Sequence, residues 1–196
     1  MASPRTPAAI PPPAEMTEAV ARLDALPELQ DSYEWFTSEE DKLADWQMEL
    51  ARIPAPPFGE AARSRWLMDR FRELKLEEVH TDEVGNVLGL RRGTAKPGKN
   101  SKGEVRGHIA LSAHIDTVFP AGTPLNICRQ GKRLLGPGIS DNAAGVVALL
   151  AIAGALRKAK ISHAAPILFI GNVGEEGEGD LRGMRHIFSK SACAAS

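Results

Sequence analysis

One long apolar stretch lies between two shorter ones, and this order constrains the fold more than any other feature of the sequence. The long stretch, Ala143 to Leu156, is interrupted by Gly145 and Gly154, is too short to span a bilayer and predicts a buried helix. The shorter ones, His108 to His114 and Pro166 to Val173, are typical of strands. Strand, helix and strand in succession predict neighbouring parallel strands covered by a helix. The predicted fold class is therefore α/β, with a mostly parallel sheet flanked by helices.

Shorter elements come before this unit, after a proline-rich start. Prolines near the N-terminus fit neither a helix interior nor a sheet, so we predict a disordered leader and linker over residues 1–31 and one folded domain over residues 32–196. The spacing of apolar residues then predicts further elements. These are helices from Ser32 to Arg52 and from about Gly59 to Leu74, strands at Glu77 to Thr81 and Asn86 to Arg91, and a hairpin from Leu125 to Leu135.

Composition argues against several classes of protein. The 24 Lys and Arg residues balance 25 Asp and Glu residues, so the net charge is −1 and no excess positive field is available for nucleic acid or anionic lipid. The first residues lack the basic and apolar regions of a secretory signal, and we expect a cytoplasmic protein. Cys128 and Cys193 are too few for a disulfide framework and are interpreted as ordinary thiols.

Acidic residues and a histidine gather where predicted strands end. In an open α/β sheet, ligands bind at this end of the strands. Side chains two positions apart share a strand face, so His114 and Asp116 point the same way, and the carboxylate can orient an imidazole that binds metal. The segments concerned are Ala113-His114-Ile115-Asp116, Gly138-Ile139-Ser140-Asp141-Asn142 and Gly174-Glu175-Glu176-Gly177.

Two of these segments also have plain structural interpretations. Asp is a favoured N-cap residue, so Asp141 is alternatively the cap of the helix that begins near Asn142. Glu175 and Glu176 are alternatively part of a solvated acidic loop. Two adjacent carboxylates after a buried strand can instead diverge, so that one binds metal and the other faces the water that the metal activates.

Other classes of site fit the sequence less well. The glycines near residues 136–145 and 171–179 miss the spacing of a dinucleotide-binding loop, and Ser112 and Ser140 lack the surroundings of a serine nucleophile. A lone histidine is more often a surface or packing residue than a ligand. No role is assigned to His80, His108, His163 or His186.

The three segments, in this order, resemble the co-catalytic zinc peptidases of the M20 type. That family includes aminoacylases, glutamate-releasing carboxypeptidases, tripeptidases and deacylases of acyl-amino acids. The resemblance continues upstream through IPAPPFGEAARSRWL and DEVGNVLGL and downstream through DLRGMRHIF, so it covers most of the chain. It implies that residues 32–196 are the N-terminal portion of a zinc-dependent peptidase or amidohydrolase catalytic domain.

Carried over residue by residue, the resemblance implies a metal role for three residues and a catalytic role for two. His114 would bind one zinc ion, Glu176 the other, and Asp141 would bridge both. Asp116 would orient His114, and Glu175 would be the general base in the hydrolysis of a peptide or acyl-amino-acid amide bond through a metal-bridging water. Two Zn²⁺ ions are implied per complete site, with Co²⁺ or Mn²⁺ as substitutes.

The resemblance also implies features of the chain around these residues. The peptide bond between Asp141 and Asn142 would be cis, placing the bridging carboxylate between the ions. Each ion would have two protein ligands here, whereas zinc sites use three or four. The remaining ligands, an acidic residue and a histidine, and a smaller lid and dimerisation domain would lie beyond Ser196.

Two classes of function remain open at this point. In the first, the chain is part of a metallohydrolase, inactive or nearly so by itself. The full-length form would be a homodimer that acts on small peptides or N-acyl amino acids and binds neither nucleic acid nor membrane. In the second, the chain is a catalytically dead α/β module that binds a metal ion or a protein partner.

Overall fold

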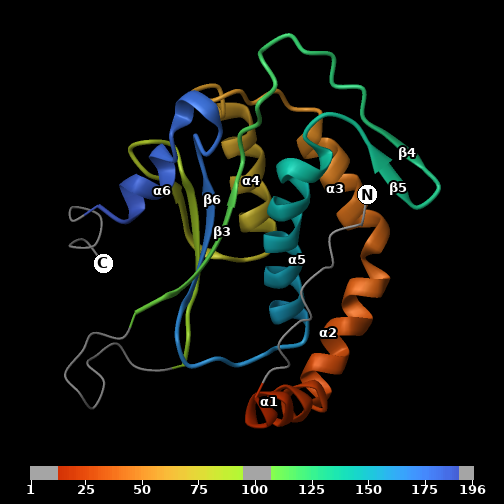
Figure 1. Ribbon diagram of the computed structural model, residues 1–196. Coiled ribbons are helices and arrows are strands. Elements are labelled where there is room, and N and C mark those ends of the chain that lie inside the picture. Colours follow the sequence, from red (N-terminus) through yellow and green to blue (C-terminus); the bar gives the residue numbers. More distant parts are fainter. Residues whose placement is uncertain (1–12, 95–106, 190–196) are drawn as a thin grey trace, which may run out of the picture.

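The computed structural model describes residues 13–94 and 107–189, which form a four-stranded sheet, a small two-stranded sheet and the helices around them (Figure 1). The helices are α1 (Ala14–Asp24), α2 (Pro27–Ser38), α3 (Glu40–Ala51), α4 (Ala61–Glu73), α5 (Gly145–Lys158) and α6 (Arg182–Ile187). The strands are β1 (Glu77–Thr81), β2 (Val87–Arg91), β3 (Ile109–His114), β4 (Cys128–Gln130), β5 (Arg133–Leu135) and β6 (Ile167–Asn172). A π-helical turn, Ile139–Ala144, leads into α5, and a 3-10 turn, Gly177–Gly179, precedes α6.

The main sheet has the order β1-β2-β6-β3, and among the described strands only β3 and β6 are parallel neighbours. β1 and β2 form an antiparallel hairpin, and β2 pairs antiparallel with β6. The predicted α/β fold is confirmed. The prediction that the sheet is mostly parallel is wrong, because the strand-helix-strand unit determines one pairing and the hairpin adds two antiparallel ones. The predicted second hairpin is confirmed as the antiparallel pair β4 and β5.

The N-terminal part of the described chain is helical where the sequence predicted a disordered leader. Residues 1–12 of that leader lie outside the described residues, but α1 and α2 begin inside it. Pro27 is at the start of α2, where its missing N–H costs no hydrogen bond. Glu39 separates α2 from α3, so the helix predicted from Ser32 to Arg52 is in fact two helices.

α4 and α5 pack against the sheet and enclose the core. α4 contacts β1 and β2, α5 contacts β3, and α2 and α3 pack on α5 (Figure 1). Phe71 of α4 and Phe169 of β6 are fully buried and meet edge to face, with ring centroids 6.4 Å apart. This packing holds the sheet against α4. The C-terminal ends of β3 and β6 continue into the acidic segments.

The apolar helix predicted from the sequence is a core helix. The span Ile139–Lys158 is long and apolar enough to cross a membrane by length and composition, but half of its apolar window is buried inside the protein. Val146, Leu150 and Ala153 of α5 are at most 1% exposed. The prediction of a buried helix is therefore confirmed.

Candidate metal centre

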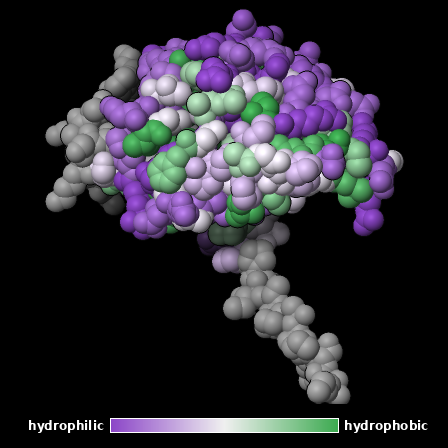
Figure 2. Space-filling model, turned by 90° about the horizontal axis from the view of Figure 1, so that it is seen from above, coloured by the Kyte–Doolittle hydropathy of each residue, from purple (hydrophilic) through white to green (hydrophobic). Residues whose placement is uncertain are grey.

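β3 and β6 end side by side at the edge of the sheet where the acidic segments follow. His114, the last residue of β3, is in register with Asn172, the last residue of β6. Beyond β6, Gly174 has a φ of 61°, a conformation that favours glycine, and it turns the chain toward Glu175 and Glu176. Figure 2 shows this end of the molecule from above, with a mainly hydrophilic surface and separate hydrophobic groups. The strand ends therefore bring together polar groups that are distant in the sequence.

His114 lies between two carboxylates. Its Nε2 is 3.0 Å from Oδ1 of Asp141, and its Nδ1 is 3.6 Å from Oδ1 of Asp116. The Asp141 side chain is 76% exposed and the His114 side chain 11%, so Nε2 faces the open side of the cluster. The structure thus brings His114, Asp116 and Asp141 together, and their metal roles remain predictions.

The buried carboxylate of Asp116 also anchors the acidic segment. Its Oδ1 accepts the backbone N–H of Glu175 at 3.1 Å, and its Oδ2 accepts the backbone N–H of Glu176 at 2.9 Å. Hydrogen bonds to a carboxylate are stronger than neutral ones, so they fix the segment after β6 against the segment after β3. The sequence predicts that Asp116 orients His114 but gives no sign of this second contact.

His114, Glu175 and Glu176 form a group that can hold a metal ion. One ligand atom from each lies within 4.8 Å of the others, and all three residues are half-buried. Two ligand atoms of a tetrahedral zinc ion lie about 3.4 Å apart, so small side-chain movements would bring these atoms, and Oδ1 of Asp141, into coordination. An imidazole nitrogen with carboxylate oxygens suits zinc or manganese. The residues present therefore fit a metal ion.

Burial and charge oppose each other at these groups. Burial would lower the pKa of His114, but the hydrogen bond with Asp116 and its charge outweigh burial and raise it. Burial would raise the pKa of Asp116, yet His114 and the backbone N–H groups of Glu176 and Glu175 hold that pKa below its ordinary value. Burial, followed by the charges of Asp141 and Glu175, raises the pKa of Glu176. Such clustered carboxylates favour a bound cation.

Asp141 lies in the distorted turn before α5, and the residue after it caps the helix. Oδ1 of Asn142 accepts the backbone N–H of Gly145 at 3.1 Å, whereas no cap bond comes from the Asp141 side chain. The interpretation of Asp141 as the helix cap is therefore wrong. The peptide bond between Asp141 and Asn142 is cis, which confirms the prediction.

A buried arginine supports the loops around the site, and sequence analysis missed it. Arg63 of α4 is 1% exposed, and it donates from Nε to the carbonyl of Ile53 at 2.8 Å and from Nη1 to that of Ile115 at 2.9 Å. Burial lowers the pKa of Arg63 to about 10, and the charge of Asp116 partly opposes this. Arg63 lies one turn before Leu67 on the apolar face of α4, and this spacing was the available signal.

Two further sets of contacts, also missed, hold α6 in place. Nη2 of Arg182 is 2.7 Å from both carboxylate oxygens of Glu60, which is 4% exposed. The fully buried Asn86 accepts the backbone N–H of Val173 and donates to the carbonyl of Gly183, both at 3.0 Å. These partners are far apart in the sequence, so no local pattern predicts the pairs.

The other described histidines do not join the metal group. Nε2 of His163 accepts a hydrogen bond from Arg91 at 3.0 Å, and the ring of His186 contacts Glu83 at 2.9 Å. The ring of His80 contacts the backbone carbonyl of Glu78. That these histidines have no metal role stays a prediction.

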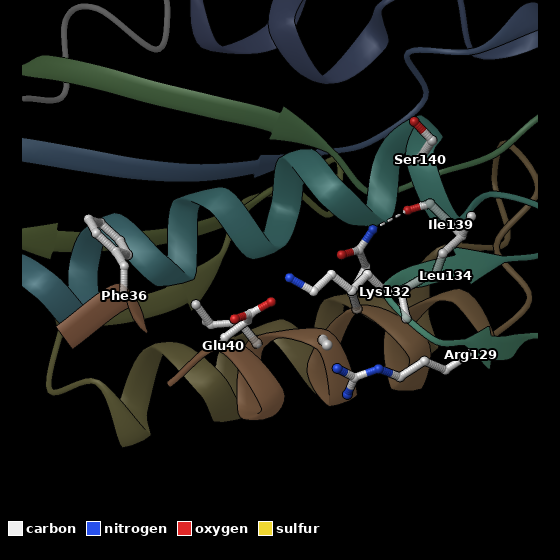
Figure 3. A pocket seen from close by; sticks show the side chains of 10 residues that line it. Phe36, Glu40, Arg129, Lys132, Leu134, Ile139 and Ser140 are labelled. Atoms are coloured by element: carbon white, nitrogen blue, oxygen red, sulfur yellow. Dashed lines mark hydrogen bonds between the residues drawn. The ribbon is translucent and has the colours of Figure 1, made fainter. Parts of the chain in front are cut away.

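A separate groove of about 470 Å³ opens between α2, α3 and the β4–β5 hairpin (Figure 3). In its wall, Gln47 donates to the backbone carbonyl of Ile139 at 2.7 Å. The groove is near the metal cluster only through Ile139 and Ser140, which precede Asp141, and no residue of the cluster lines it. Metal-type donors converge at the strand ends and not in this groove, so the cluster is the candidate site.

Comparisons with known proteins relate part of this chain to a peptidase family. Residues 110–195 match the model of "Peptidase family M20/M25/M40". A comparison with curated protein sequences gives no match.

Several solved structures share the fold. The aminopeptidase PepT from Bacillus cereus is 24% identical with a TM-score of 0.56, and the match covers 70% of this chain and 37% of that protein. A tripeptidase from Staphylococcus aureus is 24% identical with a TM-score of 0.55, and the match covers 72% of this chain and 40% of that protein. The aminoacylhistidine dipeptidase from Vibrio alginolyticus is 23% identical with a TM-score of 0.50, and the match covers 69% of this chain and 28% of that protein. The chain therefore spans less than half the length of each of these proteins.

Proposed function

We propose that the described residues of this chain, of which residues 110–195 match the model of peptidase family M20/M25/M40, supply part of a two-zinc centre that hydrolyses amide bonds in peptides or acyl-amino acids. One observation carries the proposal. His114 from the end of β3 and Glu175 and Glu176 from the segment after β6 converge into a metal-type group, with Asp116 hydrogen-bonded behind it.

We assign the metal-holding role to His114, Asp141 and Glu176. The 3.0 Å between Nε2 of His114 and Oδ1 of Asp141 supports their sharing one ion, with the Asp141 carboxylate also reaching a second ion held by Glu176. Bound zinc acts in such sites as a Lewis acid and lowers the pKa of water. Co²⁺ or Mn²⁺ would suit the same donors.

We assign proton transfer to Glu175 and ligand orientation to Asp116. The Glu175 carboxylate would take a proton from the attacking water and return it to the leaving amine. The backbone N–H of Glu175 is bonded to Asp116, so the segment that carries the base is fixed relative to His114. Glu175 and Glu176 both lie within reach of a metal ion, and the division of roles between them rests on the family resemblance.

We further propose small peptides or N-acyl amino acids as substrates and the cytoplasm as the location. The similar solved structures include an aminopeptidase, a tripeptidase and a dipeptidase, which supports a peptide substrate. A net charge of −1 argues against nucleic acid and anionic membranes as partners. For the full-length form we propose a homodimer.

Metal analysis beside an amidase assay tests the proposal. With two protein ligands for each ion among the described residues, the chain should bind zinc weakly and show at most trace hydrolysis of dipeptides and acyl-amino acids. A chain that binds no zinc at saturating concentration would exclude the metal centre. Two zinc ions retained through dialysis, with ordinary enzyme rates, would show that other residues complete the site.

The same measurements test the alternative of a catalytically dead binding module. That alternative predicts zinc binding with no hydrolysis above the rate of the Glu175→Ala variant. Trace hydrolysis that this variant loses, with zinc content unchanged, would favour the hydrolase.

A further inference from the structure

Phe58, in the loop before α4, is an exposed aromatic residue with an unusual backbone. Its φ is 69°, in the left-handed region that bulky residues rarely adopt, and the residue is 68% exposed. An exposed ring gains little from packing, so burial does not explain why the loop holds it there. Strained residues of this kind cluster at ligand-binding sites.

Two charged residues hold Phe58 in this position. Its backbone N–H donates to Oε1 of Glu60 at 3.0 Å. The Arg182 guanidinium carbon lies 4.8 Å from the centre of the Phe58 ring, and Nη2 of Arg182 also contacts both oxygens of Glu60. The cation beneath the ring and the bond to its backbone together fix the direction of the side chain.

The same contacts connect the Phe58 loop to the segments that carry the candidate metal centre. A side chain at Gly174, next to Glu175, would lie 2.7 Å from Cγ of Arg182, so the arginine that supports the ring runs along the start of the acidic segment. On the other side, the backbone carbonyl of Ala55 accepts the N–H of Thr117, the residue after Asp116, at 2.9 Å. In Figure 1 this loop lies at the same end of the molecule as the segment after β6.

We infer that Phe58 is a specificity-determining residue, whose exposed ring contacts an apolar side chain of the substrate next to the amide bond at the metal centre. The inference rests on the proposed function. Arg182 neutralises Glu60 behind the ring, so the loop offers an apolar surface and no free charge to the substrate at this point. An aliphatic or aromatic substrate side chain would therefore be preferred to hydrogen or a charged group.

Binding of two small hydroxamates to the Co²⁺-loaded chain tests the inference without depending on turnover. Glycine hydroxamate and leucine hydroxamate chelate the metal in the same way and differ by an isobutyl group. At saturating Co²⁺, the visible absorption of the metal reports their binding. The wild-type chain should bind leucine hydroxamate about tenfold more tightly than glycine hydroxamate, the scale of selectivity that an apolar contact of this size provides.

Three variants complete the test. Phe58→Ala should reduce the preference for leucine over glycine hydroxamate to below about twofold and leave the affinities for glycine hydroxamate and Co²⁺ unchanged. Phe58→Leu should retain most of this preference. Phe188→Ala, at a phenylalanine that is 67% exposed, is the matched control and should keep the wild-type ratio.

The outcomes separate this inference from the proposed function. A wild-type ratio near one, an unchanged ratio in Phe58→Ala, or an equal loss of both hydroxamates in that variant would overturn the role of Phe58 and leave the metal centre standing. A chain that binds no Co²⁺ at saturation would overturn the proposed function and this inference with it.

Discussion

Oδ2 of Asp116 accepts the backbone N–H of Glu176 at 2.9 Å, although the two residues are 60 positions apart. The backbone N–H of Glu175 donates to Oδ1 of the same carboxylate, so Asp116 alone links the segments that follow β3 and β6 by two hydrogen bonds. The position of both acidic residues relative to His114 therefore depends on a buried side chain that need not touch a metal ion.

Asp116→Asn should lower zinc affinity about ten- to a hundredfold, the usual cost of losing such a supporting partner. An Asn side chain has one acceptor oxygen where two N–H groups require acceptors, so the free energy of unfolding should also fall by about 1–3 kcal/mol. Competition with a chelator and urea denaturation measure the two effects. Asp180→Asn, at a side chain 70% exposed in the same segment, is the control and should change neither. Unchanged zinc affinity in Asp116→Asn would mean that the acidic segment is held by other contacts.

Glu175→Ala and Glu176→Ala should have different effects, although the residues are neighbours. Glu176→Ala should lower zinc affinity by at least about tenfold, because a ligand is lost. Glu175→Ala should leave zinc affinity nearly unchanged and remove the hydrolysis that an extended, active form shows. Metal content after dialysis and amidase rates distinguish the two. An equal loss of zinc in both variants would contradict the division into base and ligand.

Zinc affinity should fall as the pH is lowered, first through the raised pKa of His114 and then through the raised pKa of Glu176. Zinc binds the neutral imidazole and the ionised carboxylate, so protons compete at a higher pH than at unperturbed groups. Without metal, the raised pKa of His114 has the opposite effect on folding. Its stabilisation is present below the unfolded-state pKa and is lost as the pH rises through the folded-state pKa. Zinc titrations and urea denaturation between about pH 5 and pH 8 measure how zinc affinity and the free energy of unfolding change with pH. A zinc affinity that does not change with pH would contradict the assignment of His114.

Breaking the ion pair between Glu60 and Arg182 should destabilise the fold. Arg182→Met leaves the Glu60 side chain, 5% exposed, without its cation and should cost about 3 kcal/mol, less than a fully buried pair because Arg182 is partly exposed. Adding Glu60→Gln should restore part of the loss. Arg185→Met, which breaks the exposed pair with Asp180, should cost at most about 1 kcal/mol. A urea double-mutant cycle checks this, and additive losses would show that the pair is not coupled.

The sequence predicted individual elements better than their arrangement. β1 has the bounds that alternation predicts, and the crossover from β3 to β6 follows from the apolar run of α5. The direction of β2 beside β6 is not encoded in a local apolar pattern, because both faces of a central strand can be buried whichever way it runs. The start of α1 was missed for another reason. Its preceding prolines indicate irregular chain, but they do not prevent a helix from beginning after them.

In the candidate site, too, local contacts could be predicted from the sequence and long-range contacts could not. His114 and Asp116 are two positions apart, so strand geometry could predict that they meet. Arg63, by contrast, acts on the carbonyl of Ile115 from another element, and that contact exists only in the folded chain. The second partners of Asp116 were missed because they are backbone amides, which every residue has and no motif can show.

The register between His114 and Asn172 has a consequence for folding. The candidate centre exists only after β3 and β6 have met across the whole of α5, and closing so long a loop costs entropy before any native contact offsets it. In the unfolded chain, the same side chains are separate weak donors with no shared geometry. A metal ion that binds the native arrangement alone would stabilise it by mass action, more as its free concentration rises above the dissociation constant. Metal supply would then set what fraction of the chain is folded and how much of it escapes proteolysis.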